Sequence, residues 1–195
     1  SVYMTVFGRF LQRERERLEL LGLIGLLQDV GMLTLPAGMP GRRSDLRSEE
    51  DEIFKSHVTH GAEILSRTPG LPAELPSIAS LHHERYDGSG YARGLKGAAI
   101  SQMGAIAGIV DTFDMLTAPA PYGMQMPPSN ALNVLFQNRG TQFHAALIEQ
   151  FIQCVGAFPV GSVVELNSGE VGVVAGTPQQ LADKAERAQA EVERA

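Results

Sequence analysis

A pair of adjacent histidines that leads directly into a glycine-rich turn constrains this chain more than any other segment. Residues 82–91 read His-His-Glu-Arg-Tyr-Asp-Gly-Ser-Gly-Tyr. Neighbouring side chains at a helix end point about 100° apart, so His82 and His83 can serve two different centres. Imidazole is the commonest metal ligand, and its second ring nitrogen usually needs an acceptor, for which Glu84 and Asp87 are candidates. Solvated histidines before an ordinary turn would more often be single, so the pair predicts a metal site.

This segment and three others resemble the ordered motifs of the HD-GYP family, bacterial signalling domains on the helical HD phosphohydrolase scaffold. The first is similar to the family's His-His-Glu-x-x-Asp-Gly-x-Gly-Tyr-Pro run, with Ala92 at the place of the proline. The others are similar to Leu-Leu-His-Asp-Ile-Gly-Lys, His-Pro-x-x-Gly-x-x-Ile-Leu and Asp-x-Phe-Asp-Ala-Leu-Thr, and they lie at 26–32, 57–65 and 111–117. The resemblance implies an all-α, HD-domain helical bundle.

In that family a carboxylate and several imidazoles hold two or three transition metals, and a hydroxide that bridges them attacks the phosphodiester of cyclic di-GMP. The resemblance implies that Asp29 is the bridging, catalytic carboxylate. The remaining metal ligands that it implies are His57, His82, His83 and Asp111, and the substrate-binding residues are Asp87, Gly90 and Tyr91. Imidazole and carboxylate groups suit iron, manganese and nickel, and such metals generate hydroxide at neutral pH.

The chain departs from the family pattern at positions that bear on metal and phosphate binding. Gln28 replaces the name-giving histidine, and its amide oxygen is a weaker donor than an imidazole nitrogen. No histidine precedes Gln28, so a further family ligand on the preceding helix is not recognisable either. Met32 replaces a lysine that reaches a phosphate, and Ala120 and Gly123 replace two more cations. A dianionic dinucleotide needs such cations, because charge-assisted hydrogen bonds are stronger than neutral ones.

These residues are compatible with two alternative functions. The substitutions favour an HD-GYP module with a degenerate catalytic site, which regulates by binding proteins or the nucleotide. The alternative is a metal-dependent cyclic di-GMP phosphodiesterase, weak or active, that produces pGpG or GMP. We expect iron, manganese or nickel at reduced occupancy, or no metal at all. The expected partners are cyclic di-GMP, proteins such as cyclic di-GMP synthase domains that contact the loop at 82–94, and a second copy of the chain.

Composition argues against several other classes of protein. The formal net charge of −6 argues against a DNA-binding surface, which would be basic. The single cysteine, Cys154, excludes an internal disulfide bond. No apolar run approaches the length of a membrane span, and the N-terminal residues lack a signal-peptide pattern. We therefore expect a cytoplasmic protein without a membrane partner.

Hydrophobic periodicity predicts a mostly helical chain. Apolar residues spaced by three and four predict helices, which we place at 2–11, 18–27, 49–68, 77–84, 100–116, 130–139 and 141–155. The segment 77–84 ends in the histidine pair. Apolar residues on either side of a polar turn predict a β-hairpin over 162–166 and 171–174. The expected divisions are a helical domain at 1–155, a hairpin appendage at 156–177 and a charged terminal helix at 178–195.

Overall fold

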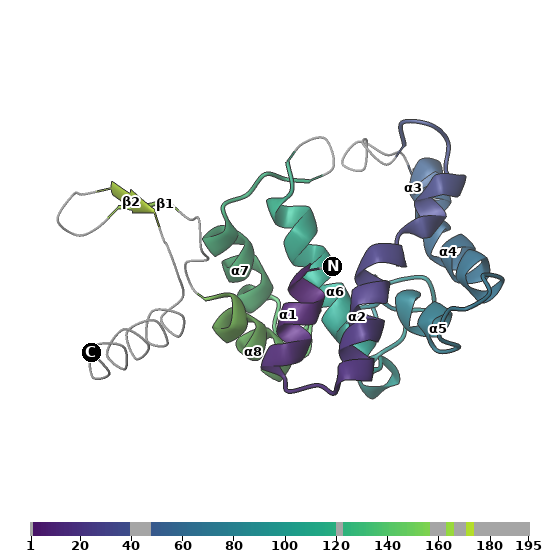
Figure 1. Cartoon of the computed structure of the whole chain (residues 1–195). Coiled ribbons are helices and arrows are strands. Elements are labelled where there is room, and N and C mark those ends of the chain that lie inside the picture. The colour runs from purple at the N-terminus through teal and green to yellow at the C-terminus, as the bar shows by residue number, and fades with distance from the viewer. Residues whose placement is uncertain (1, 40–47, 120–122, 157–162, 166–170, 174–195) are drawn as a thin grey trace.

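The computed structural model describes residues 2–39, 48–119, 123–156, 163–165 and 171–173 (Figure 1). Its α-helices are α1 (Val2–Phe10), α2 (Arg15–Leu27), α3 (Ser48–Lys55), α4 (His57–Ser66), α5 (Leu75–Ala79), α6 (Gln102–Thr117), α7 (Pro128–Gln137) and α8 (Ala145–Val155), and 3₁₀ turns lie at η1 (Val30–Thr34) and η3 (Gly97–Ala99). Strands β1 (Val163–Glu165) and β2 (Val171–Val173) pair antiparallel beside the helical body. The predicted all-α fold with a hairpin is confirmed, and the terminal helix predicted at 178–195 lies outside the described residues.

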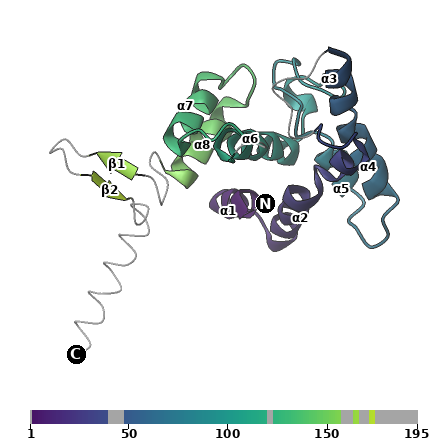
Figure 2. The ribbon, with the colours of Figure 1, turned by 90° about the horizontal axis from the view of Figure 1, so that it is seen from above.

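Helix α6 lies at the centre of the helical body and positions the histidine pair. Figure 2 shows α1 and α2 along one side of α6, with α7 and α8 towards one end and α3 to α5 towards the other. A Cβ atom at Gly108 of α6 would lie 2.9 Å from the carbonyl oxygen of His82. The missing side chain therefore lets the histidine turn pack directly on α6. Asp111 lies about one helical turn further along α6, next to His83.

The apolar core joins the helices on both sides of α6. Phe7 of α1 and Phe113 of α6 both pack edge-on against Phe151 of α8, with ring centroids 5.1 and 5.4 Å away. This geometry is favourable for aromatic rings, because a positive ring edge meets a negative ring face. Cys154 packs beside this core with a free thiol, and burial raises its pKa.

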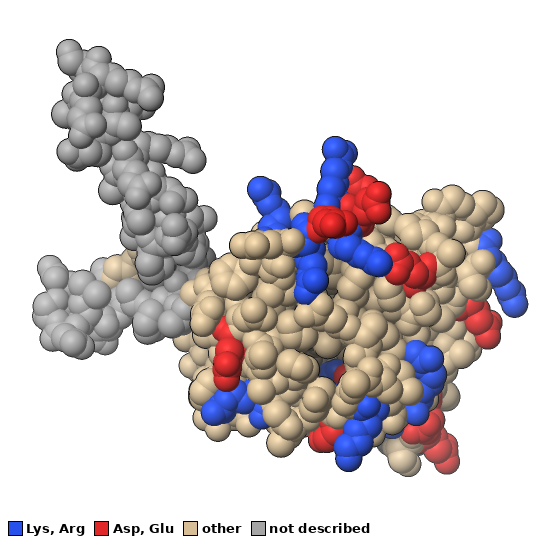
Figure 3. All heavy atoms as spheres, turned by 90° about the horizontal axis from the view of Figure 1, so that it is seen from below, with Lys and Arg blue, Asp and Glu red and all other residues tan. Residues whose placement is uncertain are grey.

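One face of the helical body is mixed in charge. On the face shown in Figure 3, basic and acidic side chains are interspersed, without a broad area of either sign. None of the helices that the structure describes combines the length and the apolar character needed to cross a bilayer.

Most predicted helices differ from the structure by one to four residues at an end, and two differ in a way that has an identifiable cause. The helix expected at 49–68 breaks at Ser56 into α3 and α4. Ser56 Oγ donates to the carbonyl of Ile53 at 2.6 Å, and the His57 ring bonds the carbonyl of Phe54 at 2.6 Å. A continuous helix would offer those carbonyls to backbone N–H groups four residues on, so the side chains compete with it.

The short helix expected at 77–84 is also corrected. Helix α5 ends at Ala79, and the histidine pair lies in the turn that follows it. His82 bonds the carbonyl of Ala79 through its ring, at 2.6 Å, in the same manner as His57. His57 and His82 thus each follow the end of a helix, α3 and α5 respectively. The hydrogen bond from each ring to a carbonyl of that helix fixes the orientation of the ring.

We expect Gly31→Ala to destabilise the fold strongly. A Cβ atom at Gly31 would lie 1.9 Å from the carbonyl oxygen of His57 and 2.6 Å from the amide nitrogen of Gly61, so η1 and α4 would have to separate. Overpacking of this kind costs about 3 kcal/mol in the free energy of unfolding. Urea denaturation measures the change. Gly22→Ala is the matched control, because its added carbon reaches only Thr5 at 3.4 Å; equal losses for both variants would contradict the packing argument.

Candidate metal centre

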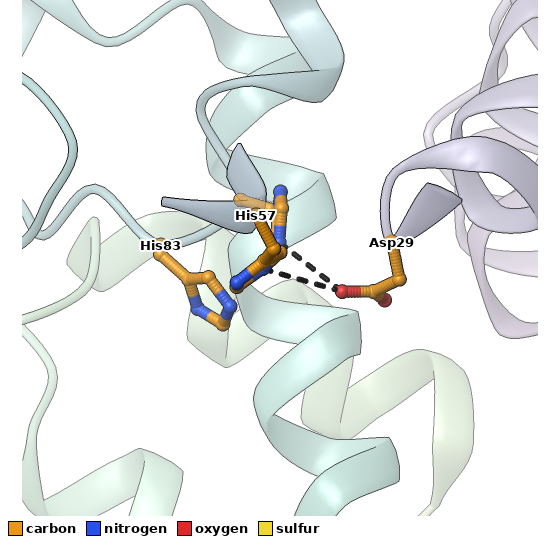
Figure 4. A group of neighbouring side chains, drawn as sticks. Asp29, His57 and His83 are labelled. Atoms are coloured by element: carbon orange, nitrogen blue, oxygen red, sulfur yellow. Dashed lines mark ion pairs between the residues drawn. The ribbon is translucent and has the colours of Figure 1, made fainter. Parts of the chain in front are cut away.

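Four side chains from three separate segments converge at one point. Asp29 lies between α2 and η1, His57 begins α4, and His82 and His83 follow α5. Each offers one ligand atom, and these atoms all lie within 4.8 Å of one another. Asp29 Oδ1 is 3.6 Å from Nε2 of His57 and 3.5 Å from Nε2 of His82 (Figure 4). Motifs that are far apart in the sequence therefore build one cluster, which we call the His–Asp cluster.

Burial differs between the two sides of the His–Asp cluster. The side chains of His57, His82 and His83 are 0%, 0% and 2% exposed, whereas 46% of the Asp29 side chain is exposed. Figure 4 shows Asp29 extending from its own segment towards the imidazole rings. The cluster is thus closed by imidazoles on the inside and reached from solvent at the carboxylate.

The hydrogen bonds of two rings fix which nitrogen can bind a metal. A carbonyl oxygen only accepts, so Nδ1 of His57 donates to Phe54 and Nδ1 of His82 donates to Ala79. In the neutral ring, the lone pair is then on Nε2, which is the atom that faces Asp29 in both residues. Metal-binding histidines are commonly oriented by such a bond from the other ring nitrogen.

The electrostatics of the His–Asp cluster favour an ionised carboxylate. Burial raises the pKa of Asp29, but a hydrogen bond from His82 in its protonated form and the positive charges of His82 and His57 outweigh it, so this pKa lies below its ordinary value. Burial lowers the pKa of His82, but its bond to Asp29 and the charge of Asp111 raise it above its ordinary value overall. Three imidazoles with one carboxylate form a donor set that fits iron, manganese or nickel.

Asp111 stands at the edge of the His–Asp cluster. Its Oδ2 atom is 3.8 Å from Nδ1 of His83, and its Oδ1 atom accepts a hydrogen bond from Nε2 of Gln28 at 3.0 Å. The residue that replaces the name-giving histidine therefore contacts the late carboxylate directly. Of the five implied ligands, four gather within the cluster and Asp111 lies beside them.

The implied substrate-binding residues lie on the turn after the histidine pair. Asp87 is exposed and accepts bonds from the backbone N–H and the hydroxyl of Ser89, which lower its pKa. A Cβ at Gly90 would lie 2.4 Å from the His83 carbonyl, so glycine allows the turn to fold back on the pair. Tyr91 stacks on the His83 ring with centroids 4.6 Å apart, and Lys55 Nζ lies 5.9 Å from the Tyr91 ring centroid.

The structure also shows the surroundings of two positions at which the family pattern has a cationic residue and this chain does not. Met32 is half-buried in η1, next to the segment that carries Asp29. A Cβ at Gly123 would lie 2.4 Å from the carbonyl oxygen of Ala118, so a long cationic side chain does not fit this backbone. Ala120 lies outside the described residues, and Ala92 directly follows Tyr91. Among the described positions, Met32 is the one at which a lysine could be restored.

Glu84 has a role that its place in the motif did not reveal. It is 4% exposed, and its two carboxylate oxygens accept hydrogen bonds from the backbone N–H groups of Arg93 and Leu95, each at 2.8 Å. Rather than orienting His57 or His82, whose rings bond backbone carbonyls, Glu84 closes the loop that carries Tyr91. The sequence could not predict this contact, because the loop nine to eleven residues after Glu84 has no motif that marks it as a partner of the glutamate.

We expect Glu84→Gln to lower the free energy of unfolding by about 2 kcal/mol, because a buried amide NH₂ would then face a backbone N–H group. Chemical denaturation of the purified domain checks this value. Glu63→Gln, at an exposed position of α4, is the matched control and should change stability by less than about 0.5 kcal/mol. A neutral effect of Glu84→Gln would show that the two bonds do not hold the loop.

The comparisons with known proteins agree with this geometry. The family model described as "HD domain" matches residues 2–147. The chain belongs to the HD domain family. The cyclic di-GMP phosphodiesterases named below agree with the resemblance of its ordered motifs to those of HD-GYP proteins.

Relatives of this HD domain carry names that refer to cyclic dinucleotides. The cyclic di-GMP phosphodiesterase PA4108 of Pseudomonas aeruginosa is 31% identical over 153 residues, which cover 78% of this chain and 37% of that protein. A cyclic di-GMP phosphodiesterase of Thermotoga maritima is 36% identical over 128 residues (65% and 35%). The 3′3′-cGAMP-specific phosphodiesterase 2 of Vibrio cholerae is 34% identical over 128 residues (65% and 24%). The HD domain described here thus spans 24% to 37% of these three proteins.

A solved structure shares the fold of this HD domain. Bd1817, an HDG"Y"P protein from Bdellovibrio bacteriovorus, matches with a TM-score of 0.64 at 18% sequence identity. The match covers 77% of this chain and 50% of that one. At this identity the likeness establishes the fold, and the chemistry has to be argued from the residues of this chain.

Proposed function

We propose that this HD domain binds cyclic di-GMP beside a transition metal held by Asp29, His57, His82 and His83, that it hydrolyses the nucleotide very slowly or not at all, and that its role is regulatory. The observation that carries the proposal is the contact between Gln28 and Asp111 at 3.0 Å. The position that should supply an imidazole to a further metal instead supplies an amide N–H to a carboxylate.

In such a site, some residues would bind the metal and others would contact the nucleotide. A bound metal would supply Lewis acidity towards a phosphate oxygen or a water molecule. The buried imidazoles would hold it, with Nε2 of His57 and His82 presented by their bonds to backbone carbonyls. Asp29, which is half-exposed, would face both the metal and the entering ligand. Tyr91, stacked on His83, would line the entrance.

The second candidate function is an active cyclic dinucleotide phosphodiesterase. The specific observation in its favour is that the His–Asp cluster is complete, with all four ligand atoms within 4.8 Å of one another. The relatives named as phosphodiesterases for cyclic di-GMP and for 3′3′-cGAMP support the same function. The two candidates share the ligand class and differ in whether the bond is cut.

Binding and turnover, measured on the same preparation, separate the two functions. We expect calorimetry to detect binding of cyclic di-GMP by protein loaded with Mn²⁺ or Fe²⁺, while chromatography detects little pGpG or GMP. 3′3′-cGAMP is the matched second nucleotide. Robust turnover that Asp29→Ala abolishes would establish the phosphodiesterase instead, and failure of both nucleotides to bind would refute both candidates.

A further inference from the structure

Gln28 occupies a buried position beside the carboxylate of Asp111. It follows the last residue of α2 and is 6% exposed. Its Nε2 atom donates to Oδ1 of Asp111 at 3.0 Å. Asp29, which belongs to the His–Asp cluster, is the next residue in the chain. The carboxamide NH₂ group therefore contacts Asp111 from a position that adjoins the His–Asp cluster in the chain.

The orientation of this amide follows from its surroundings. An NH₂ group donates and a carboxylate accepts, whereas an amide oxygen turned towards Asp111 would meet another acceptor. With the nitrogen facing Asp111, Oε1 of Gln28 is buried without a hydrogen-bond partner among the residues that the structure describes. The side chain thus donates to Asp111 and leaves its own oxygen unsatisfied. An amide that served only to fill space would not require that arrangement.

We infer that the carboxamide NH₂ of Gln28 takes the place of a cation at Asp111, so that this chain holds a metal at the His–Asp cluster and no second metal at Asp111. The inference rests on the proposed function, which assigns the metal to the His–Asp cluster. A cation that approached Asp111 from this side would meet the partial positive charge of the N–H hydrogens. The second position is therefore closed by a side chain of the chain itself.

The structure also defines the change that should open it. Gln28→Glu keeps the shape of the side chain but replaces the donor with a carboxylate oxygen. The new carboxylate would then stand beside Asp111, and two close carboxylates repel one another unless a cation or a proton neutralises them. Oxygen ligands suit Mn²⁺. Gln28→His would instead supply the imidazole that the family motif has at this position.

The test counts Mn²⁺ ions by elemental analysis and records electron paramagnetic resonance spectra of the full chain. We expect about one ion per chain in the wild type and about two in Gln28→Glu and Gln28→His, with the spin-coupled spectrum of neighbouring Mn²⁺ ions only in the variants. Adding Asp111→Asn to Gln28→Glu should return the count to one. Gln153→Glu, at an exposed position of α8, is the matched control and should leave the count unchanged.

The outcomes distinguish this inference from the proposed function. Two ions in the wild type, with one lost in Gln28→Leu, would mean that Oε1 of Gln28 is a ligand and would overturn the inference alone. No ion in the wild type would refute the proposed metal centre. In that case, a gain of one Asp111-dependent ion in Gln28→Glu would still support the role of Gln28, and no gain would overturn it. Thermal melting of each variant verifies that it is folded.

Discussion

Alanine at His57 is expected to weaken metal binding by at least about 100-fold, since even the partners that orient a ligand are worth 10–100-fold in affinity. The ring is fully buried and its Nε2 atom faces Asp29 at 3.6 Å. Its removal leaves the His–Asp cluster without one of its three imidazoles and also without the bond that holds the Phe54 carbonyl. Titration with Ni²⁺ or Mn²⁺, followed by calorimetry, measures the loss.

His60→Ala is the control for this experiment. His60 lies on the same helix, is exposed, and bonds Thr34 rather than the His–Asp cluster. Its replacement should leave metal affinity unchanged. Because His57→Ala also removes a buried hydrogen bond, the affinity is compared only after circular dichroism has shown that the variant is folded. A folded His57→Ala protein with wild-type affinity would mean that the metal lies elsewhere.

The motifs predicted which side chains converge better than periodicity predicted the helix ends. Residues 29, 57, 82 and 83 could be expected to meet because each motif is short and internally ordered, and they do meet. The ends of α3 and α5 could not be predicted, because they depend on histidine rings that bond the carbonyls of Phe54 and Ala79. A hydrophobic pattern indicates which face of a helix is buried, but it does not indicate which backbone carbonyl forms a hydrogen bond with a side chain.

Tertiary contacts account for the other differences between sequence and structure. The 3.0 Å contact between Gln28 and Asp111 joins residues 83 positions apart, so the sequence could show the loss of an imidazole but not the bond that replaces it. Glu84 binds a loop that has no motif of its own. The sequence alone indicates the loss of a cationic side chain at Gly123. The structure shows that any side chain at this position would clash with the backbone of Ala118, which explains the glycine on steric grounds.

Turnover should reappear when metal and phosphate contacts are restored together. Gln28→His supplies an imidazole near Asp111, and Met32→Lys places an ammonium group on η1, next to the segment that carries Asp29. A charge-assisted hydrogen bond is worth about 1.5 kcal/mol or more, which corresponds to about tenfold in rate if it forms in the transition state. We therefore expect the double variant to hydrolyse cyclic di-GMP at least about tenfold faster than Gln28→His alone.

The matched control separates this effect from a general gain of positive charge. Met124→Lys makes the same substitution at a loop position that is 63% exposed, and it should not change the rate in the Gln28→His background. Rates are measured with saturating Mn²⁺, so that differences in metal affinity do not enter. If Met124→Lys is as effective as Met32→Lys, the added charge acts by attracting the nucleotide from solution, and position 32 is not a phosphate contact. If neither double variant exceeds Gln28→His, the missing cations at 120 and 123 limit the reaction, and the steric constraint at Gly123 then prevents its repair by substitution alone.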